Sequence, residues 1–468
     1  MATIERAGVA RTASPEPVTS TKPSGSTKPP EVVHERDPEI IGVAQQLEPL
    51  VRTMLGGQVP LRVQGWDGSV IGPADSPGTI VIKRPDAMRR ILYAPNELGL
   101  GRAYVAGDLD LDGDIFALLG VRDALGARQE HVDLGFSRRS LVELWKLARE
   151  WKVLGRPLPA PSEEARLTGR LHTRGRDADA VSHHYDVGND FYRLFLGETM
   201  TYSCGYWPDA SIGLDGAQTA KYDLICRKLG LRPGMRLLDV GCGWGGMVLH
   251  AAQHYGVEAV GITLSREQQD LARARVAAAG FDDRIEVRYQ DYRDVGDEPF
   301  DAISSIGMFE HVGVGRSREY FEHLHALLAP GGRLLNHAIS RPQPAKKPAM
   351  DRHSFIARYV FPDGELIEVG TTVSAMQSLG LEVRDVESLR EHYARTLRAW
   401  VTNLEANWEE AVRLVGPARA RIWRLYMAGS AVGFEQDRIN IHQVLAVRPD
   451  DAGHSHMPPT RTWLTAGA

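Results

Sequence analysis

The stretch LLDVGCGWGG at residues 237–246 joins an apolar run to a loop that contains Gly241, Gly243 and Gly245. An apolar run of this kind is typical of a strand that is buried on both faces of a parallel sheet. Glycine lets the backbone turn sharply and approach a ligand without a Cβ in the way. The stretch therefore predicts a buried strand, a tight turn beside a ligand, and a helix over GMVLHAAQHYG at 246–256.

Strands and helices alternate in the residues that follow this turn. Further apolar strands are predicted over VEAVGITLS (257–265), IEVRYQD (285–291), FDAISSIGMFEHV (300–312) and RLLNHAIS (333–340). Helices are predicted between them, for example over REQQDLARARVAAAG, and apolar strands that alternate with helices form a parallel sheet covered on both faces. The fold class is therefore α/β.

The C-terminal part of this pattern adds two more candidate strands. These are LEVRDVESL at 381–389 and INIHQVLAV at 439–447. A long helical segment separates them, from Arg390 to about Phe434.

Length and composition suggest two domains with tails. We divide the 468 residues into a disordered tail (1–38), an accessory domain (39–155), a basic linker (156–176), the α/β domain (177–448) and a C-terminal tail (449–468). The first tail is rich in Pro, Ser, Thr, Lys and Glu, a composition that buries too little apolar surface to fold.

The accessory domain has the pattern of a small α+β unit. Alternating residues in LRVQGWDG (61–68) and TIVIKR (79–84) predict half-buried strands. Helical spacing appears in PDAMRRILYAP and DIFALLGVRDAL. The connector ARLTGRLHTRGRD (165–177) fits either a solvated linker or a segment that contacts anionic lipid headgroups.

Bulk features exclude several classes of protein. A net charge of −5 gives no sign of a nucleic-acid partner, and no run of about 18 apolar residues predicts a transmembrane helix. Cys204, Cys226 and Cys242 form no CxxC pair, which argues against a disulfide scaffold or a structural zinc site. His183 with His184, and His323 with His325, supply too few converging ligands for a metal. These features fit a reducing cytoplasm.

The glycine turn alone leaves the cofactor open, because dinucleotide-binding folds use a related turn. Two details favour S-adenosylmethionine. The glycine spacing is not GxGxxG, and Asp239 ends the strand, where it could bind the ammonium of a methionine moiety. The alternative is a turn that serves only the packing of helix on sheet.

The ends of the next two strands supply further candidate cofactor ligands. Thr263 and Leu264 end the second strand, and Gln268 could bind the ribose hydroxyls. On the third strand, Asp291 could accept from the adenine amino group and Tyr292 could cover the ring. Ligands bind at the carboxyl ends of strands in open α/β sheets, although Asp and Gln at such positions also cap helices.

Six motifs together resemble one family. They are YDVGNDFY (185–192), MTYSCGYW (200–207), LLDVGCGWGG (237–246), GITLSREQ (261–268), SIGMFEHVG (305–313) and NHAIS (336–340). They are similar to cyclopropane-fatty-acyl-phospholipid synthases, a group that includes the mycolic-acid cyclopropane synthases. The resemblance spans about residues 180–446, and ELGLGRAYVAGDLD (97–110) extends it weakly into the accessory domain. It implies a class I methyltransferase Rossmann-like sheet and S-adenosylmethionine as the cofactor.

The resemblance also implies a reaction and a set of residues. The expected reaction transfers a methyl(ene) carbon to the cis double bond of an unsaturated fatty acyl chain in a phospholipid, at a membrane surface reached from the cytoplasm. A bound bicarbonate is the expected base, held by backbone groups of Cys204 and Ile339 and by side chains of Glu310, His337 and Tyr426. Tyr202 and Ser203, in MTYSC, are expected along the cofactor, and a homodimer is expected by analogy.

Each catalytic candidate has a structural alternative. Cys204 could be a small buried residue, Glu310 and His311 could cap a helix, and His337 could be a core histidine that is already hydrogen-bonded.

The sequence departs from the family pattern at FPDGELIEV (361–369), where Asp363 and Glu365 add charge, and at Ser430, where cysteine is common. These departures leave the product open between a cyclopropane ring and a methylene branch of the 10-methylene type found in actinobacterial relatives. Two other functions stay open: a methyltransferase that acts on nitrogen or oxygen of a small molecule, and a non-catalytic lipid-binding or scaffold protein.

Overall fold

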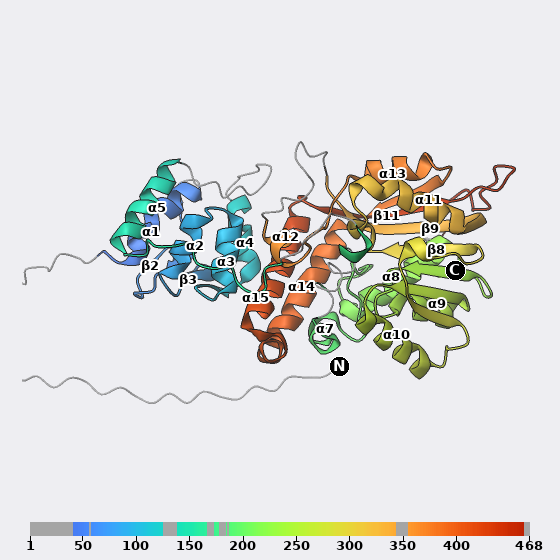
Figure 1. The fold of residues 1–468 in the computed structure, drawn as a ribbon, viewed down its shortest axis with the longest axis horizontal. Helices are drawn as coiled ribbons and strands as arrows, with labels where there is room; N and C mark the ends of the chain where they lie inside the picture. The colour runs from blue at the N-terminus through green and yellow to red at the C-terminus, as the bar shows by residue number, and fades with distance from the viewer. Residues whose placement is uncertain are drawn as a thin grey trace, which may run out of the picture. The chain divides into compact units, whose positions relative to one another are not determined.

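The computed structural model describes residues 41–55, 58–124, 138–165, 173–176, 184, 187–342 and 354–462. Residues 42–468 form one compact unit, and the description that follows concerns this unit (Figure 1). The predicted tail at 1–38 lies outside the described residues, as do parts of the predicted linker and of the C-terminal tail.

The larger sheet has seven strands in the order β10-β11-β9-β8-β5-β6-β7. The strands are β5 Arg236–Val240, β6 Glu258–Thr263, β7 Ile285–Tyr289, β8 Phe300–Ile306, β9 Leu328–Ser340, β10 Glu382–Ser388 and β11 Asn440–Val447. Each of them covers a stretch that the sequence predicts to be a strand. The pairs β5–β6, β6–β7, β5–β8 and β8–β9 are parallel.

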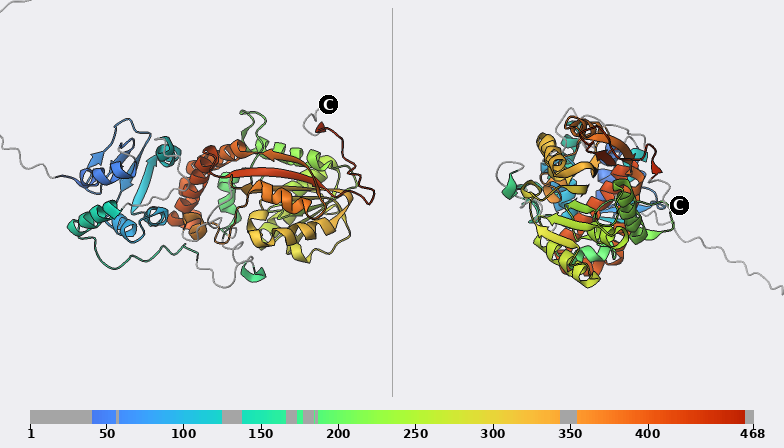
Figure 2. Two further views of the ribbon diagram at one scale, coloured as in Figure 1. Left: turned by 90° about the horizontal axis from the view of Figure 1, so that it is seen from above. Right: turned by 90° about the vertical axis from the view of Figure 1, so that its right-hand side faces the viewer.

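The prediction of a parallel sheet from the alternating strands holds for β5 to β9, whereas β11 runs antiparallel to both β9 and β10. The chain connects β10 to β11 through two helices, α14 Arg390–Ala406 and α15 Trp408–Glu435, which pack side by side (Figure 2). A single helix after β10 would carry the chain back to the level where β10 begins, and the next strand would then run parallel to it. Two antiparallel helices bring the chain back to the level where β10 ends, so the next strand runs antiparallel. Accordingly, the backbone N–H of Leu389 donates to the carbonyl of Ile441 near the start of β11 (2.9 Å).

Helices cover both faces of this sheet, as predicted (Figure 1). One face packs against α8 Gly213–Leu229, α9 Gly246–Tyr255 and α10 Arg266–Ala279, and the other against α11 Ser317–Leu327 and α13 Val369–Gln377. Successive strand residues point to opposite faces: Leu237 belongs to the core under the first group, and Leu238 to the core under the second. This alternation explains why the strands are apolar throughout.

The smaller sheet has four strands in the order β2-β1-β3-β4. Its strands are β1 Arg62–Gln64, β2 Val70–Ile71, β3 Gly78–Ile82 and β4 Leu109–Gly113, and the helices around it are α1 Val43–Met54, α2 Asp86–Tyr93, α3 Glu97–Val105, α4 Ile115–Ala124 and α5 Arg138–Glu150. Strands β1 and β3 and helices α2 and α4 lie where the sequence predicts them. No helix in the described ranges has both the length and the apolar character that a membrane span requires.

An aromatic core joins α7 Asn189–Leu196 to α14 and α15. At its centre the ring of Trp423 lies 5.1–6.0 Å, centroid to centroid, from six other rings, those of His184, Phe191, Tyr192, Phe195, Tyr202 and Tyr426. Phe191 and Tyr192 are buried in this core. The core therefore fixes Tyr202 and Tyr426, two of the residues singled out in the sequence.

Replacing Trp423 by alanine should remove this packing and lower the free energy of unfolding by about 3–5 kcal/mol, the usual cost of deleting a buried aromatic side chain. Urea unfolding followed by circular dichroism measures the change. Trp145→Ala is the control, because Trp145 on α5 is 49% exposed and its loss should change stability by no more than about 0.5 kcal/mol. Equal effects of the two variants would contradict the central place of Trp423.

Candidate active site

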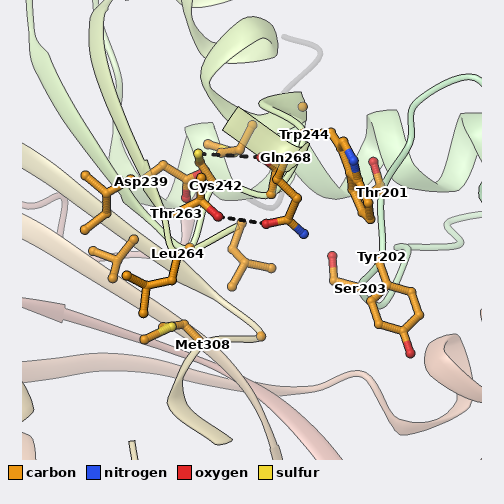
Figure 3. Close-up of a pocket in the computed structure, with 18 of the residues that line it drawn as sticks. Thr201, Tyr202, Ser203, Asp239, Cys242, Trp244, Thr263, Leu264, Gln268 and Met308 are labelled. Atoms are coloured by element: carbon orange, nitrogen blue, oxygen red, sulfur yellow. Dashed lines mark hydrogen bonds between the residues drawn. The ribbon is translucent and has the colours of Figure 1, made fainter. Parts of the chain in front are cut away.

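A pocket lies at the carboxyl ends of β5, β6 and β8, with Ser203 and Tyr202 on the side opposite Asp239 and Thr263 (Figure 3). Nine of the eleven predicted cofactor residues line it: Tyr202, Ser203, Asp239, Gly241, Gly243, Thr263, Leu264, Gln268 and Tyr292. They come from separate parts of the chain, and the sheet brings them together because parallel strands end at the same edge.

The glycine turn shapes one wall of the pocket. Gly241 and Gly243 have positive φ angles of 79° and 54°, a backbone conformation that other residues rarely adopt. A Cβ on Gly243 would meet no atom within 4 Å, so the backbone there borders open space. Gly245 differs, because its Cβ would lie 3.2 Å from Ala272 of α10. Gly243 thus leaves room for a ligand, Gly241 lets the turn pass close to Met308, from which a Cβ would lie 3.3 Å away, and Gly245 permits close helix packing.

Asp239 is a buried carboxylate at the base of the pocket, only 2% exposed. It accepts a hydrogen bond from the Ser304 hydroxyl (2.6 Å). Burial raises the pKa of Asp239 to about 6, against the opposing effects of Ser304 and Lys221. A carboxylate held in this way is suited to a positively charged group of a ligand, which would compensate its charge.

On the next strand, Thr263 donates a hydrogen bond to the side-chain oxygen of Gln268 (2.8 Å), and this bond is drawn in Figure 3. The bond orients the amide and leaves its NH₂ group as the remaining donor. Donation to a ribose hydroxyl is compatible with this arrangement.

Asp291 does not line the pocket. Its side chain caps the short helix Tyr292–Asp294 by accepting from the backbone N–H of Arg293 (3.0 Å), and it also forms an ion pair with the Arg293 side chain (2.5 Å). This is the capping role that the sequence leaves open as the alternative. Gln290, which the sequence does not single out, lines the pocket beside Tyr292. Contact of Asp291 with an adenine amino group stays a prediction.

Glu310 stands on a one-turn helix, Phe309–His311, that follows β8 directly. The backbone N–H of Ile339 donates to its Oε1 (2.7 Å), whereas Oε2 is buried and has no hydrogen-bond partner among the described residues. Burial raises the pKa of Glu310 to about 7. The structure thus brings together Glu310 and Ile339, two residues that the family resemblance assigns to one site, and places there an acid whose pKa lies near neutral pH. Their contact with a bicarbonate stays a prediction.

The two tyrosines of the predicted set also meet. The hydroxyl of Tyr202 donates to that of Tyr426 (3.2 Å). Burial raises the pKa of Tyr426 to about 12, and the charge of Glu310 acts in the same direction. Both hydroxyls therefore stay protonated at neutral pH.

His337 is buried on β9, two residues before Ile339, so both side chains point to the same face of the sheet. Its Nδ1 lies 3.2 Å from the side-chain nitrogen of Gln443 on β11, and its Nε2 is buried without a partner in the described ranges. Burial lowers the pKa of His337 well below its usual range. The ring is therefore neutral and keeps one unused nitrogen.

Cys204 is fully buried, and its thiol contacts the carbonyl oxygens of Gly205 (3.2 Å) and Leu389 (3.7 Å). Burial raises the pKa of this thiol far above neutral pH, so the thiol is protonated. These contacts match the alternative of a small buried residue, and they leave only the Cys204 backbone for a role in catalysis.

Several pocket residues are missed by the motif-based prediction, among them Lys221 and Tyr222 on α8, Trp244 and Met308. Lys221 belongs to no motif. A signal was nevertheless present, because Lys221 and Lys228 recur at a seven-residue interval among the apolar residues Leu224 and Ile225. That spacing places two lysines on the buried face of a helix.

The acidic residues that depart from the family pattern are held by neighbouring groups. Asp363 forms a two-pronged ion pair with Arg176 (2.6 and 2.7 Å). Glu365 accepts from the backbone N–H of Val314 (2.7 Å), and its own backbone N–H donates to the carbonyl of Glu310 (3.1 Å). Glu365 therefore braces the loop that carries Glu310, whereas Asp363 ties its own segment to Arg176.

Comparison with known proteins identifies relatives over most of the chain. The family model described as mycolic acid cyclopropane synthetase matches residues 172–444. A probable fatty acid methyltransferase of Mycobacterium tuberculosis is 43% identical over 434 residues, which cover 90% of this chain and 98% of that protein. Two further relatives are each 34% identical: the tuberculostearic acid methyltransferase of M. tuberculosis (83% and 88% covered) and the cyclopropane-fatty-acyl-phospholipid synthase of Escherichia coli (81% and 90%).

Among solved structures, a mycolic acid cyclopropane synthase in complex with S-adenosylhomocysteine and CTAB is 36% identical, with a TM-score of 0.55. The match covers 57% of this chain and 97% of that one. The two chains therefore share the fold of the larger sheet and its helices, the class I methyltransferase fold expected from the motifs.

The raised pKa of Glu310 predicts a pH dependence of stability. Because the folded protein binds this proton more tightly than the unfolded chain, the contribution of Glu310 to stability falls as pH rises from about 4.5 to about 7. Glutamine does not titrate, so Glu310→Gln should not lose stability in this way as pH rises. The melting temperature of the variant minus that of wild type should therefore be larger at about pH 8 than at about pH 5.

Glu368→Gln is the matched control. Burial alone would raise the pKa of Glu368, but hydrogen bonds from its own backbone, Arg341 and Thr371 lower it. The contribution of this carboxyl to stability therefore changes only below about pH 4.5, and Glu368→Gln should differ from wild type by nearly the same melting temperature at about pH 5 and at about pH 8. Differential scanning fluorimetry at the two pH values measures both, and a flat difference for Glu310→Gln would show that burial does not shift this carboxyl.

Proposed function

The chain belongs to the mycolic acid cyclopropane synthetase family and is an S-adenosylmethionine-dependent methyltransferase that modifies fatty acyl chains; we propose that it acts on the cis double bond of an unsaturated chain in a phospholipid and forms a cyclopropane ring. The observation that carries this proposal is the position of Glu310. It is a buried carboxylate with one unpaired oxygen, between two residues, Met308 and His311, that line the cofactor pocket.

The pocket residues fit S-adenosylmethionine. Asp239 is the partner for the ammonium, Gln268 has an amide donor for the ribose, and the turn at Gly243 leaves space for the ligand. Tyr292 lines the pocket where an adenine ring would lie. When bound, the cofactor supplies an electrophilic methyl group on a sulfonium.

An alkene is a weak nucleophile, and its attack on the methyl leaves positive charge on carbon. In this step a C–C bond forms, the C–S bond breaks and its electron pair stays on sulfur. The surrounding aromatic core, with Tyr202, Tyr426 and Trp423, offers π-electron density to the cation. The same core excludes water, which would otherwise trap the cation.

Ring closure requires the loss of a proton from the transferred methyl group. Glu310 Oε2 and His337 Nε2 are buried polar atoms that lack partners in the described ranges, and such atoms call for a ligand. Bicarbonate suits them, because it presents both an O–H donor and anionic acceptors, and when bound it supplies the base. With Gln443 as donor to Nδ1, the Nε2 of His337 carries the hydrogen and can donate.

A methylene-branched product is the second candidate. In that route a hydride shift relocates the cation before the same proton is lost, and the relation to the tuberculostearic acid methyltransferase supports it. We favour the ring because Asp363 and Glu365 are engaged by Arg176 and Val314, so the departures from the family pattern add no unpaired charge to the loop beside the pocket. Because the proposed substrate is part of a phospholipid, the protein would act at a membrane surface.

The test uses the full-length protein, labelled S-adenosylmethionine and vesicles of oleoyl phospholipid, followed by mass spectrometry of the released acyl chains. Each modified chain should gain one CH₂ unit. The NMR spectrum should lack olefinic protons if a ring forms, and should show a terminal methylene if the branch forms. Label only on headgroups, or on no lipid, would refute an acyl substrate.

Glu310→Gln should bind S-adenosylmethionine as wild type does but lose turnover by about 10²-fold or more, the usual contribution of proton transfer in catalysis. Isothermal titration calorimetry and the vesicle assay measure the two quantities. Glu368→Gln, which changes a carboxylate that pairs with Arg341 instead, should keep its turnover. Normal turnover in Glu310→Gln would show that this carboxylate takes no part in the reaction.

A further inference from the structure

Helix α8 carries two lysines that are completely buried. Lys221 and Lys228 both have 0% exposure, and their spacing of seven positions places both on one face of the helix. Lysine is almost never fully buried unless its charge is compensated, because removing an ammonium from water is costly. Each of these lysines therefore calls for a negative partner.

Lys228 has its partners within the protein. Its ammonium forms ion pairs with Asp385 (3.2 Å) and Glu387 (2.5 Å), both on β10. These two carboxylates compensate the charge of Lys228 where α8 packs against the sheet.

Lys221 lacks such a partner. Its ammonium donates to the neutral hydroxyl of Ser203 (2.9 Å) and lies 4.2 Å from the centre of the Tyr222 ring. No carboxylate in the described part of the chain forms an ion pair with it within 4.0 Å. An ammonium has three N–H donors, so one neutral acceptor leaves two of them available.

Lys221 also lines the cofactor pocket, together with Ser203 and Asp239. The charges of Lys221 and Asp239 influence each other there, although the two groups form no ion pair. The pocket thus presents one buried cation and one buried anion that stand apart. This arrangement is complementary to a zwitterion, which carries an ammonium and a carboxylate.

A purely structural role for Lys221 would be to hold the Thr201–Ser203 segment. Neutral groups of the same helix already do so, because Gln218 donates to the carbonyl of Ser203 (2.8 Å) and Tyr222 shares a hydrogen bond with the Thr201 hydroxyl (2.6 Å). A third neutral donor would serve equally well at lower cost. The positive charge of Lys221 therefore needs another explanation.

We propose that Lys221 binds the carboxylate of the methionine moiety of S-adenosylmethionine, while Asp239 binds its ammonium. The proposal rests on the cofactor assigned above and adds a binding residue that no motif identifies. Burial lowers the pKa of Lys221 to about 7, and a bound carboxylate would favour the charged form and offset this effect.

The test compares equilibrium binding of S-adenosylmethionine with that of its decarboxylated form, which keeps the sulfonium and the ammonium. Calorimetry without lipid gives both dissociation constants. Wild type should prefer S-adenosylmethionine by about tenfold or more, the usual value of a charge-assisted hydrogen bond in a buried site. Lys221→Met should lose this preference by binding S-adenosylmethionine more weakly and the decarboxylated form almost unchanged.

Three controls separate the alternatives. Lys228→Met removes an equally buried lysine of the same helix and should keep the preference even if stability falls. Lys221→Arg retains the charge and should keep part of the preference. Methylthioadenosine, which lacks the whole amino-acid moiety, should bind wild type and Lys221→Met equally. If Lys221→Met does not fold, Lys221→Gln, which keeps a donor for Ser203, replaces it.

Two results would overturn the proposal: a preference that survives in Lys221→Met, or an equal loss of affinity for all three ligands, which would show that Lys221 only supports the pocket wall. If wild type bound none of the three ligands, the cofactor assignment itself would fail. Failure of the cofactor assignment can be told apart from failure of the Lys221 proposal, because the two results that overturn the proposal both require that wild type binds the ligands.

Discussion

The buried charges at the carboxyl edge of the larger sheet are the constraint on which the site depends. Asp239 and Lys221 are removed from water there, and the carboxyl of Glu310 is largely so. A reaction that passes through a carbocation requires a dry site, and a dry site makes every unpaired charge costly. In the proposed reaction both demands are met because these groups are left incompletely paired, so that bound ligands would complete them.

The loop that carries Glu310 shows how the fold holds such a group in place. The backbone N–H of Ile339 on β9 donates to one carboxyl oxygen of Glu310. The backbone N–H of Glu365 donates to the backbone carbonyl of Glu310. Both contacts use backbone groups, whose positions the sheet and the following turn determine. The free oxygen of Glu310 is therefore fixed by secondary structure, which would limit the reorganisation needed in the proposed reaction.

Family relatives with different product names share this scaffold. One is named for a cyclopropane product and another for tuberculostearic acid, at the same identity to this chain. In chemical terms the two routes differ only after the methyl group has been transferred, in whether a hydride moves before the proton leaves. Under the proposed reaction, the shared scaffold would serve the common step, and small changes around the cation would decide the second.

The sequence by itself determined the succession of strands and helices along the chain, the glycine turn and the position of Asp239 at the end of a strand, because short-range patterns specify them. Glu310 and Ile339 were singled out only through the resemblance to a family. Only the tertiary structure decided the direction of β11 and the presence of Lys221 in the pocket. These features arise where distant segments meet: two helices reverse the chain before β11, and α8 packs beneath the sheet edge. No local pattern encodes which distant partner a buried side chain will meet.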